Sequence, residues 1–284
     1  MAIFTNQATL SYNNTTTTSN IVTGEIIEPL TATKNALSDT YQIGDTVTYV
    51  ISILNTGNTA INNLTVTDNL GAYPFNTSTR VPLTYVPDSI NYYANGVLQT
   101  TVTAVAGPPL VISGINIPAN GNGLIIYETR VNEFAPLASS STITNTATIS
   151  GNELTSDIVV SETITTASNA NLSITKSISP ETVTENGQLT YTFVIQNTGN
   201  TPAVATDNVT VTDDFNPILN PIVVTLNGIT LTEGTQYTYD ETTGLFQTIP
   251  GVITVPAATY SQDPTTGQWD IVPGAVILQV TGTV

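Results

Sequence analysis

The feature that most constrains this chain is an internal repeat of about 140 residues, in which the same motifs occur twice in the same order. The only two lysines, Lys34 and Lys176, lie 142 positions apart. Each is followed by T-Y-x-x-x-I-x-N-T-G-N-T and then by T-V-T-D. A repeat of this length, in a chain of 284 residues, predicts two tandem domains of the same fold.

The repeated motifs have the two-residue period of β-strands. Around the first lysine, Leu30, Ala32, Lys34 and Ala36 fall on one face of an expected strand. Two further strands are expected at 46–54 and 64–68, on either side of an Asn-Thr-Gly-Asn turn. No helical period of useful length is present. Short strands separated by turn residues predict an all-β chain of two antiparallel sandwiches, with a donor strand and linker at 1–28, a first domain at 29–166 and a second at 167–284.

One strand of the repeat is out of phase. The segment T-I-T-N-T-A-T-I-S closes the first repeat around Asn145, and its copy, T-N-Q-A-T-L-S, surrounds Asn6, 139 positions earlier. The segment that follows is copied too, because S-D-I-V-V-S-E-T-I echoes S-N-I-V-T-G-E-I. No such strand follows Lys176 before Val284. The second repeat is therefore expected to lack its last strand, while the N-terminus carries a spare.

Composition argues against several classes of function. Four Lys and Arg residues against 21 Asp and Glu residues give a net charge of −17, so nucleic acids and anionic membranes would repel the chain. It has no cysteine and no histidine, which removes thiolate nucleophiles, the commonest general base and the commonest metal ligand. We therefore expect neither an enzyme nor a metal or cofactor site. No apolar run approaches the length of a bilayer, so membrane insertion is not expected.

The N-terminus has neither the basic nor the apolar region of a signal peptide. Two explanations stay open. A signal peptide was removed, or the protein is assembled in the cytoplasm of a mother cell that later lyses, as the outer layers of spores are. Both place the mature protein outside the cell, on a bacterial cell or spore surface.

The combined pattern of a lysine strand, G-D-x-V-T-Y, N-T-G-N-T, V-T-V-T-D and I-T-N-T-A-T resembles the "conserved repeat" immunoglobulin-like domains of bacterial surface proteins. The resemblance covers nearly the whole chain and implies an Ig-like sandwich with a structural role. The chain is also similar to pilin, adhesin and spore-appendage subunits crosslinked by isopeptide bonds. In those proteins the lysine lies on the first strand, the asparagine on the last, and an acid between them.

The same residue types fall on apolar strand faces here. Burial disfavours a charged amine and a charged carboxylate, so it lowers the pKa of lysine and raises that of aspartate. An uncharged amine that meets an asparagine carboxamide, with an acid beside it, can displace ammonia and form a Lys–Asn isopeptide bond. In the first domain we expect this intramolecular bond between Lys34 and Asn145, assisted by Asp68.

In the second domain the lysine is Lys176 and the acid is Asp213, but the matching asparagine is Asn6, at the other end of the chain. We therefore expect Asn6 to come from a neighbouring subunit. A sandwich that lacks its last strand has an open edge, and an added strand would complete it. The contact is head to tail, so it builds a homopolymer unless it closes into a ring.

The donor strand needs apolar anchors beside Asn6. Phe4, Ala8 and Leu10 lie on the same face of the expected strand. They would fill the positions that Ile143, Ala147 and Ile149 fill in the first domain.

Simpler interpretations stay open for each feature. The lysines can extend to solvent from strand ends, and the aspartates can be turn residues. Glu128 is a rival acid, weakened because its apparent counterpart is Gln279; Asp214 is another, on the face opposite Asp213. The N-terminal strand can fold back on its own chain, or the chain can be a slice of a longer array. Trp269 and the tyrosines can form a sugar-binding platform, although core packing is the commoner role.

The sequence favours a structural subunit of a surface filament, joined by donor-strand complementation and by isopeptide bonds within and between subunits. The alternative is a stalk or spacer segment of a large bacterial surface adhesin, in which binding is done elsewhere. A hydrolase would need a carboxylate pair that the sequence does not show.

Overall fold

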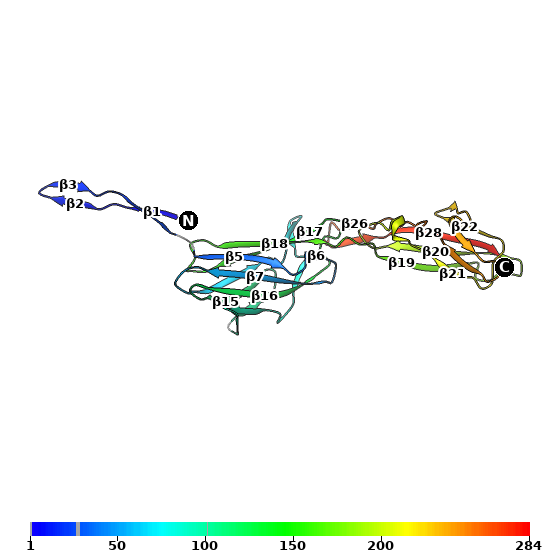
Figure 1. The fold of residues 1–284 in the computed structure, drawn as a ribbon, viewed down its shortest axis with the longest axis horizontal. Coiled ribbons are helices and arrows are strands. Elements are labelled where there is room, and N and C mark those ends of the chain that lie inside the picture. Colours follow the sequence, from blue (N-terminus) through cyan, green and yellow to red (C-terminus); the bar gives the residue numbers. More distant parts are fainter. Residues whose placement is uncertain (1, 27–28, 101) are drawn as a thin grey trace. The chain divides into compact units, whose positions relative to one another are not determined.

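The computed structural model describes residues 2–26, 29–100 and 102–284 and consists almost entirely of β-strands (Figure 1). Within those ranges the one helical segment is the short 3-10 turn η1, Ala205–Asp207. Contacts divide the chain into two units, Met1–Ala135 with Ile143–Ile164, and Pro136–Thr142 with Thr165–Val284. The predicted all-β fold is confirmed.

The first unit contains two antiparallel sheets that enclose one core. The order of the first sheet is β13-β12-β16-β7-β5, with β11 also on β16, and the order of the second is β14-β15-β8-β17-β18-β6. Their inward side chains alternate with outward ones, as the sequence period predicts. The first sheet comprises β5 (Leu30–Ala36), β7 (Thr46–Asn55), β11 (Leu83–Tyr85), β12 (Asn91–Ala94), β13 (Val97–Gln99) and β16 (Gly121–Val131). The second comprises β6 (Thr40–Tyr41), β8 (Ile61–Asp68), β14 (Thr103–Val105), β15 (Leu110–Ile117), β17 (Thr142–Ser150) and β18 (Ile158–Thr166); a small hairpin adds β9 (Tyr73–Phe75) and β10 (Ser78–Arg80).

Strand β17 closes the core of the first unit. It pairs with β8 so that Ala147 lies opposite Asp68 and Ile149 opposite Val66. Its inward residues Ile143, Asn145, Ala147 and Ile149 are all buried. The next strand, β18, covers the adjacent part of the core with Ile164.

The second unit repeats the first sheet but not the second. Its main sheet has the order β19-β20-β28-β22-β23, and a smaller sheet has the order β21-β25-β24. In the described chain, β21 is paired only with β25, so the edge that β17 occupies on β8 is open. The strands are β19 (Leu172–Ser179), β20 (Gln188–Asn197), β21 (Thr212–Asp214), β22 (Ile222–Leu226), β23 (Ile229–Thr230), β24 (Tyr237–Tyr239), β25 (Leu245–Thr248), β26 (Thr259–Gln262), β27 (Trp269–Val272) and β28 (Gly274–Thr283).

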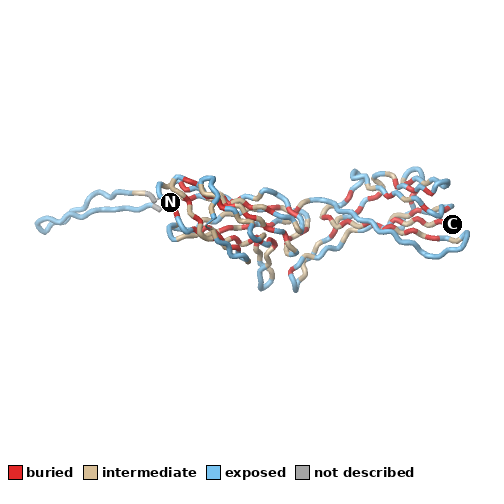
Figure 2. The backbone as a smooth tube through the Cα atoms, turned by 90° about the horizontal axis from the view of Figure 1, so that it is seen from below, coloured by how far each residue is buried: buried red, intermediate tan, exposed pale blue. Residues whose placement is uncertain are grey.

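The open edge leaves apolar side chains of β19 uncovered. Leu30 on β5 is 4% exposed, whereas its counterpart Leu172 on β19 is 37% exposed and the nearby Ile174 is 52% exposed. Both residues lie on the strand face that carries Lys176. The second unit therefore has a core of its own with one side incompletely covered (Figure 2).

The N-terminal arm, residues 2–26, forms a hairpin. Strand β1 (Ala2–Asn6) pairs with β4 (Val22–Ile26), and β2 (Thr9–Tyr12) pairs with β3 (Thr15–Thr18). Asn13 and Asn14 both have positive φ, which suits the tight turn between β2 and β3. Figure 2 shows the arm pale blue along most of its length, because its side chains are exposed. The predicted donor strand is therefore divided in two, and Ala8 lies between its halves.

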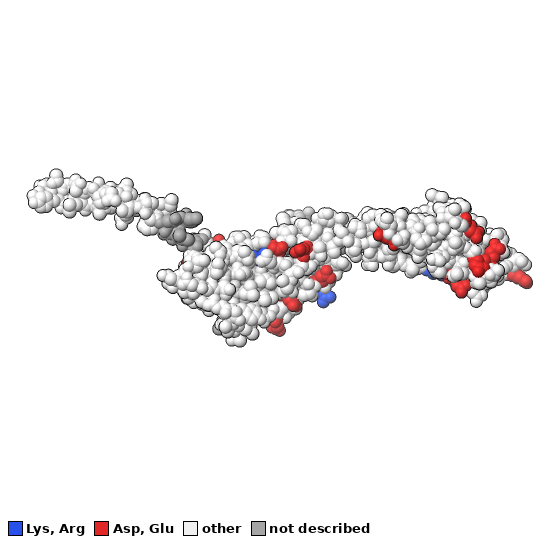
Figure 3. Space-filling model, in the orientation of Figure 1, with Lys and Arg blue, Asp and Glu red and all other residues white. Residues whose placement is uncertain are grey.

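Charges are sparse on the surface. Figure 3 shows wide uncharged areas on the drawn face, with acidic residues gathered over part of the second unit. In the ranges that the structure describes, no helix is long and apolar enough to cross a bilayer.

Candidate crosslinking sites

The first candidate site surrounds Lys34 in the core of the first unit. Lys34 lies on β5, and its Nζ is 2.5 Å from Oδ2 of Asp68, the last residue of β8. Both side chains are fully buried. The sequence period placed them on inward faces, and the packing of the two sheets brings them together.

Asp68 has further partners that fix its carboxylate. Its Oδ2 also accepts a hydrogen bond from the hydroxyl of Tyr127 on β16, and its Oδ1 accepts one from the backbone N–H of Leu70, at 2.8 Å. A buried carboxylate is stable only when its oxygens are paired in this way. These hydrogen bonds fix the carboxylate beside the amine of Lys34.

Asn145 lies on β17 in the same part of the core. Its Oδ1 accepts a hydrogen bond from the backbone N–H of Gly71, at 3.2 Å. Its Nδ2 is buried and has no hydrogen-bond partner among the described residues. Burial raises the pKa of the nearby Tyr49 and Tyr127. The unpartnered nitrogen is the atom that isopeptide formation would release as ammonia.

Burial governs the protonation of Lys34. It lowers the pKa of the amine to about 8, while the carboxylate of Asp68 and, more weakly, that of Glu162 on β18 oppose the shift. The aromatic rings of Tyr49 and Tyr127 flank the amine, with Nζ 4.9 Å and 6.0 Å from their centroids. A pKa near 8 leaves about a tenth of the amines uncharged at pH 7, and these are nucleophilic.

The arrangement supplies the parts that amide exchange requires. It holds an amine of lowered pKa, a carboxylate that can take its proton, and a backbone N–H on the carboxamide oxygen, where negative charge would develop. It has no thiol or imidazole, and the described residues contain no group of three or more acids that could hold a metal ion.

The second candidate site has the same pair in a different setting. Lys176 on β19 forms an ion pair with Oδ2 of Asp213 on β21. The side chain of Lys176 is 40% exposed and that of Asp213 is 17% exposed. The Lys176 Nζ lies 4.3 Å from the ring centroid of Tyr191, the counterpart of Tyr49. In the first unit β17 pairs with β8 and brings Asn145, whereas in the described chain no strand pairs with β21 on that edge.

Strand register identifies how the two sites differ. Tyr127 lies opposite Tyr49, and Val280 lies opposite Tyr191, so the hydroxyl that holds Asp68 has no counterpart in the second unit. The Nζ of Lys176 instead lies 5.4 Å from the ring centroid of Phe215.

The rival acids are placed away from the lysines. Glu128 lies on the outward face of β16, between the buried Tyr127 and Thr129. Glu128 lies opposite Thr48, and the corresponding Thr190 lies opposite Thr281. The counterpart of Glu128 is therefore Thr281, and not Gln279 as the sequence comparison suggested. Asp214 is exposed beside the half-buried Asp213.

The proposed donor residues lie in the exposed arm. Asn6 ends β1 opposite Val22. Phe4 and Leu10 are 51% and 65% exposed. Between the paired strands, the Ala8 carbonyl accepts a hydrogen bond from the Ser19 N–H, and the Ala8 N–H donates one to Ser19 Oγ. In this single chain these residues meet neither Lys176 nor Asp213. The arm pairs with itself, which was the simpler of the sequence interpretations.

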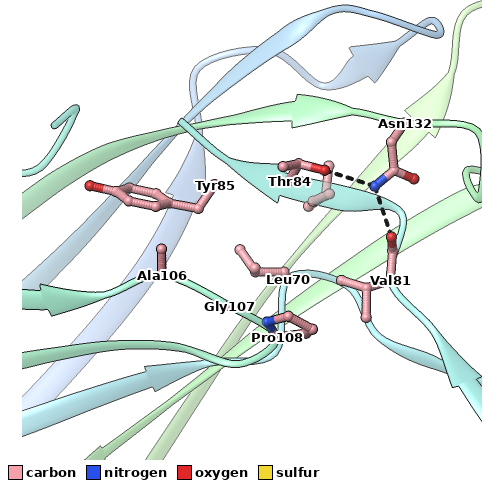
Figure 4. Close-up of a pocket in the computed structure, with 9 residues that line it drawn as sticks. Leu70, Val81, Thr84, Tyr85, Ala106, Gly107, Pro108 and Asn132 are labelled. Atoms are coloured by element: carbon pink, nitrogen blue, oxygen red, sulfur yellow. Dashed lines mark hydrogen bonds between the residues drawn. The ribbon is translucent and has the colours of Figure 1, made fainter. Parts of the chain in front are cut away.

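A surface hollow of the first unit lies next to the first site, because Leu70, whose N–H bonds Asp68, also lines the hollow (Figure 4). Asn132 donates hydrogen bonds there to the carbonyl of Val81, at 2.9 Å, and to Thr84 Oγ1, at 3.0 Å. Leu70, Ala106 and Pro108 also line it, and it has no lysine, arginine or carboxylate. We assign it no chemistry.

Sequence reasoning missed the residues contributed by other elements. Tyr127, Tyr49 and the Gly71 N–H complete the first site, and Glu162 influences it electrostatically. One signal was available. Tyr127 is the one aromatic hydroxyl on the inward side of β16, where Ile125 and Val131 are apolar.

Comparisons with known proteins return distant structural likenesses. No protein-family model matches the chain, and no curated protein matches its sequence. Among solved structures, BcpA, the major pilin subunit of Bacillus cereus, is 13% identical with a TM-score of 0.38, over 96% of this chain and 73% of that one. The pilus backbone RrgB of Streptococcus pneumoniae is 10% identical with a TM-score of 0.33, over 86% and 55%. A collagen-binding domain of a Staphylococcus aureus adhesin is 12% identical with a TM-score of 0.30, over 50% and 99%.

These structures are pilin and adhesin domains of Gram-positive bacteria. At such identities and TM-scores the likeness concerns the general fold. The function proposed below rests on the residues of this chain.

Proposed function

We propose that this protein is a structural subunit of an extracellular filament on a bacterial cell or spore surface. Each subunit would complete the second unit of the next subunit with its N-terminal arm, so that the filament grows head to tail. Lys34 and Asn145 would form an isopeptide bond within each subunit. Lys176 would form the equivalent bond with Asn6 of the neighbouring subunit.

The observation that carries the proposal is the exposed Lys176–Asp213 pair beside the open edge of β21. In the first unit the same pair is buried under β17, the strand that brings Asn145. The arm carries a copy of that strand, with Phe4 and Leu10 exposed. An open strand edge and an unburied apolar stripe on one part of a chain, and a matching free strand on another, favour association between copies.

Bond formation would proceed without a cofactor or an oxidant. The uncharged Nζ of Lys34 attacks Cγ of Asn145, a proton passes through Asp68 to Nδ2, and the Cγ–Nδ2 bond breaks to release ammonia. The Gly71 N–H, which already contacts Oδ1, stabilises the charge that develops on the oxygen. At the second site the arm would supply the Asn6 carboxamide beside Lys176 and Asp213.

The internal bond would also explain how a chain without cysteine is reinforced. A crosslink that closes a loop on the order of 100 residues stabilises a fold by about 4.7 kcal/mol, if isopeptides act like disulfides in the chain-entropy model. It persists under reducing conditions. Repeated bonds between subunits would make the filament one covalent chain.

Boiling in SDS tests the intermolecular bond. The assembled wild-type protein should give a ladder on a gel. Lys176→Ala and Asn6→Ala should each abolish the ladder, and Lys34→Ala, which removes a lysine from the other site, should leave it. A single monomer band from assembled wild-type protein would contradict the proposal and favour the alternative of a passive stalk segment in an adhesin.

Intact mass tests the internal bond separately. The wild-type monomer should weigh less than its sequence by the mass of one ammonia, and Asn145→Ala should carry the mass of its own sequence. A wild-type monomer of unmodified mass would exclude the Lys34–Asn145 bond.

A further inference from the structure

The first unit is completed by two strands of a hairpin, and not by β17 alone. Strand β18 follows β17 in the sequence and lies next to it in the sheet. Ile164 is buried in the core, and Ile158 and Val160 pack against it. On the far side of β18, β6 contributes Tyr41, which is fully buried.

The second unit lacks both strands within the described chain. Its smaller sheet ends at β21, so neither β17 nor β18 has a counterpart there. Val183, which corresponds to Tyr41 through the 142-residue spacing, is 37% exposed. Adding a single strand beside β21 would leave this second strip of the unit uncovered.

The arm copies both strands. Its first half repeats the β17 sequence around Asn6, and its second half, S-N-I-V-T-G-E-I, repeats the β18 sequence S-D-I-V-V-S-E-T. It already folds as a hairpin, with β1 paired to β4. The connections also match: β4 ends at Ile26 shortly before β5 begins at Leu30, as β18 ends at Thr166 shortly before β19 begins at Leu172.

We infer that the donated element is the whole hairpin of residues 2–26, which would occupy the positions of both β17 and β18 in the second unit of another copy of this chain. The inference rests on the proposed function and extends it. Sandwiches and hairpins would then alternate along the filament, within and between subunits. Each hairpin would complete the unit before it and lead directly into the next.

The sequence match identifies which side chains of β4 would face the core. Ile21 corresponds to Ile158, which packs against the core of the first unit. Val22 corresponds to Val159, which is 61% exposed. In the free arm the two residues are similarly exposed, at 61% and 56%. The two residues therefore make a matched pair for mutation: they are similarly exposed in the free arm, but only Ile21 is expected to face the core once the hairpin has bound to the second unit.

Seating would require a change of strand register in the arm. In the first unit, Thr144 and Thr146 of β17 bond the hydroxyls of Thr163 and Ser161 on β18, so Asn145 lies opposite Glu162. The equivalent pairing would place Asn6 opposite Glu25, whereas in the free arm Asn6 lies opposite Val22. A shift by an odd number of residues exchanges the two faces of a strand. The shift would place Ile21 on the same face of the hairpin as Asn6, and Val22 on the opposite face.

Three variants of the full chain test the inference. Leu10→Asp changes the first strand, Ile21→Asp the inward side of the second, and Val22→Asp its outward side. Assembly of purified monomers would be followed by light scattering and electron microscopy. Burying a carboxylate is costly, so Leu10→Asp and Ile21→Asp should each weaken assembly by more than about tenfold, and Val22→Asp by less than about twofold.

The outcomes separate the two proposals. If Leu10→Asp blocks assembly and Ile21→Asp does not, one strand is donated and the hairpin inference is wrong. If Val22→Asp is as damaging as Ile21→Asp, the assigned faces are wrong and the inference is overturned. If Leu10→Asp assembles normally, the proposed function itself fails.

Discussion

The two units of this protein contain the same lysine–aspartate pair in opposite environments. In the first unit, β17 and β18 cover the pair, and Lys34 and Asp68 are fully buried. In the second, Lys176 and Asp213 meet at an open edge, and the lysine is 40% exposed. The ion pair itself therefore needs only β5 and β8 or their counterparts. Burial, and the asparagine of the proposed bond, come from β17, the strand that pairs with β8.

The difference also shows what determines strand length. The sequence predicts equivalent strands ending at Asp68 and Asp213, because both have alternating apolar residues. Strand β8 runs over Ile61–Asp68 between two neighbours, whereas β21 is limited to Thr212–Asp214. The two sequences have the same intrinsic preference for β-structure. Strand β21 is shorter because its open edge has no partner strand, which leaves its backbone groups on that side unpaired.

The largest difference between the units should appear when the acid is removed. Asp68→Ala leaves a buried lysine without its partner, which should destabilise the first unit by about 3–5 kcal/mol, in addition to losing the crosslink. Asp213→Ala removes a partly exposed pair and should cost the monomer about 0–1 kcal/mol. Urea unfolding measures both, with circular dichroism for the whole chain and Trp269 fluorescence for the second unit. Equal losses would mean that burial does not distinguish the sites.

A peptide of residues 1–28 should make the second unit more like the first. Added to a chain that lacks these residues, at 100 times its dissociation constant, it should stabilise the second unit by about 2.7 kcal/mol. The core of the first unit contains no arm residue, so its stability should not change. The control is the same peptide with Leu10→Asp, which should give no shift; an equal shift from that peptide would indicate non-specific binding.

Tyr127→Phe should make the first site more like the second, where Val280 stands. The variant removes the hydroxyl that bonds Asp68 and should cost the first unit about 2 kcal/mol, the usual range for a hydrogen bond to a charged group. Thermal unfolding of a Tyr127→Phe, Asn145→Ala double variant against Asn145→Ala alone isolates this effect from crosslinking. No loss of stability would show that the tyrosine does not hold the carboxylate.

The pH dependence of the internal bond should reflect the lowered pKa of Lys34. The reactive amine is uncharged, and its fraction rises from about a tenth at pH 7 to about nine-tenths at pH 9 if the pKa is about 8. Protein isolated in urea before it has folded, and therefore before the bond has formed, should lose ammonia about tenfold faster when diluted into buffer at pH 9 than at pH 7. Intact mass followed over time measures the rate. A rate that does not change with pH would contradict attack by the uncharged amine.

The sequence predicted the fold, and the inward placement of the three residues of the first candidate site, because both depend on alternation. Lys34, Asp68 and Asn145 lie on inward faces of strands that the two-residue period located. Tyr127 and the Gly71 N–H could not be assigned, because their contacts depend on how the two sheets face each other. The pairing of the arm with itself stayed only an alternative for another reason: β1 and β4 are separated by a polar, Thr-rich segment that resembles a linker until its pairing is seen.

The central claim is that Lys176 of one chain is joined to Asn6 of another. Filaments assembled from an equal mixture of subunits with natural and with ¹⁵N-labelled nitrogen, boiled in SDS and digested, would show this directly by mass spectrometry. The account predicts a Lys176–Asn6 crosslinked peptide in which half of the molecules carry one segment of each isotope. Unmodified Lys176 in SDS-resistant material, or crosslinked peptides of a single isotope only, would contradict it.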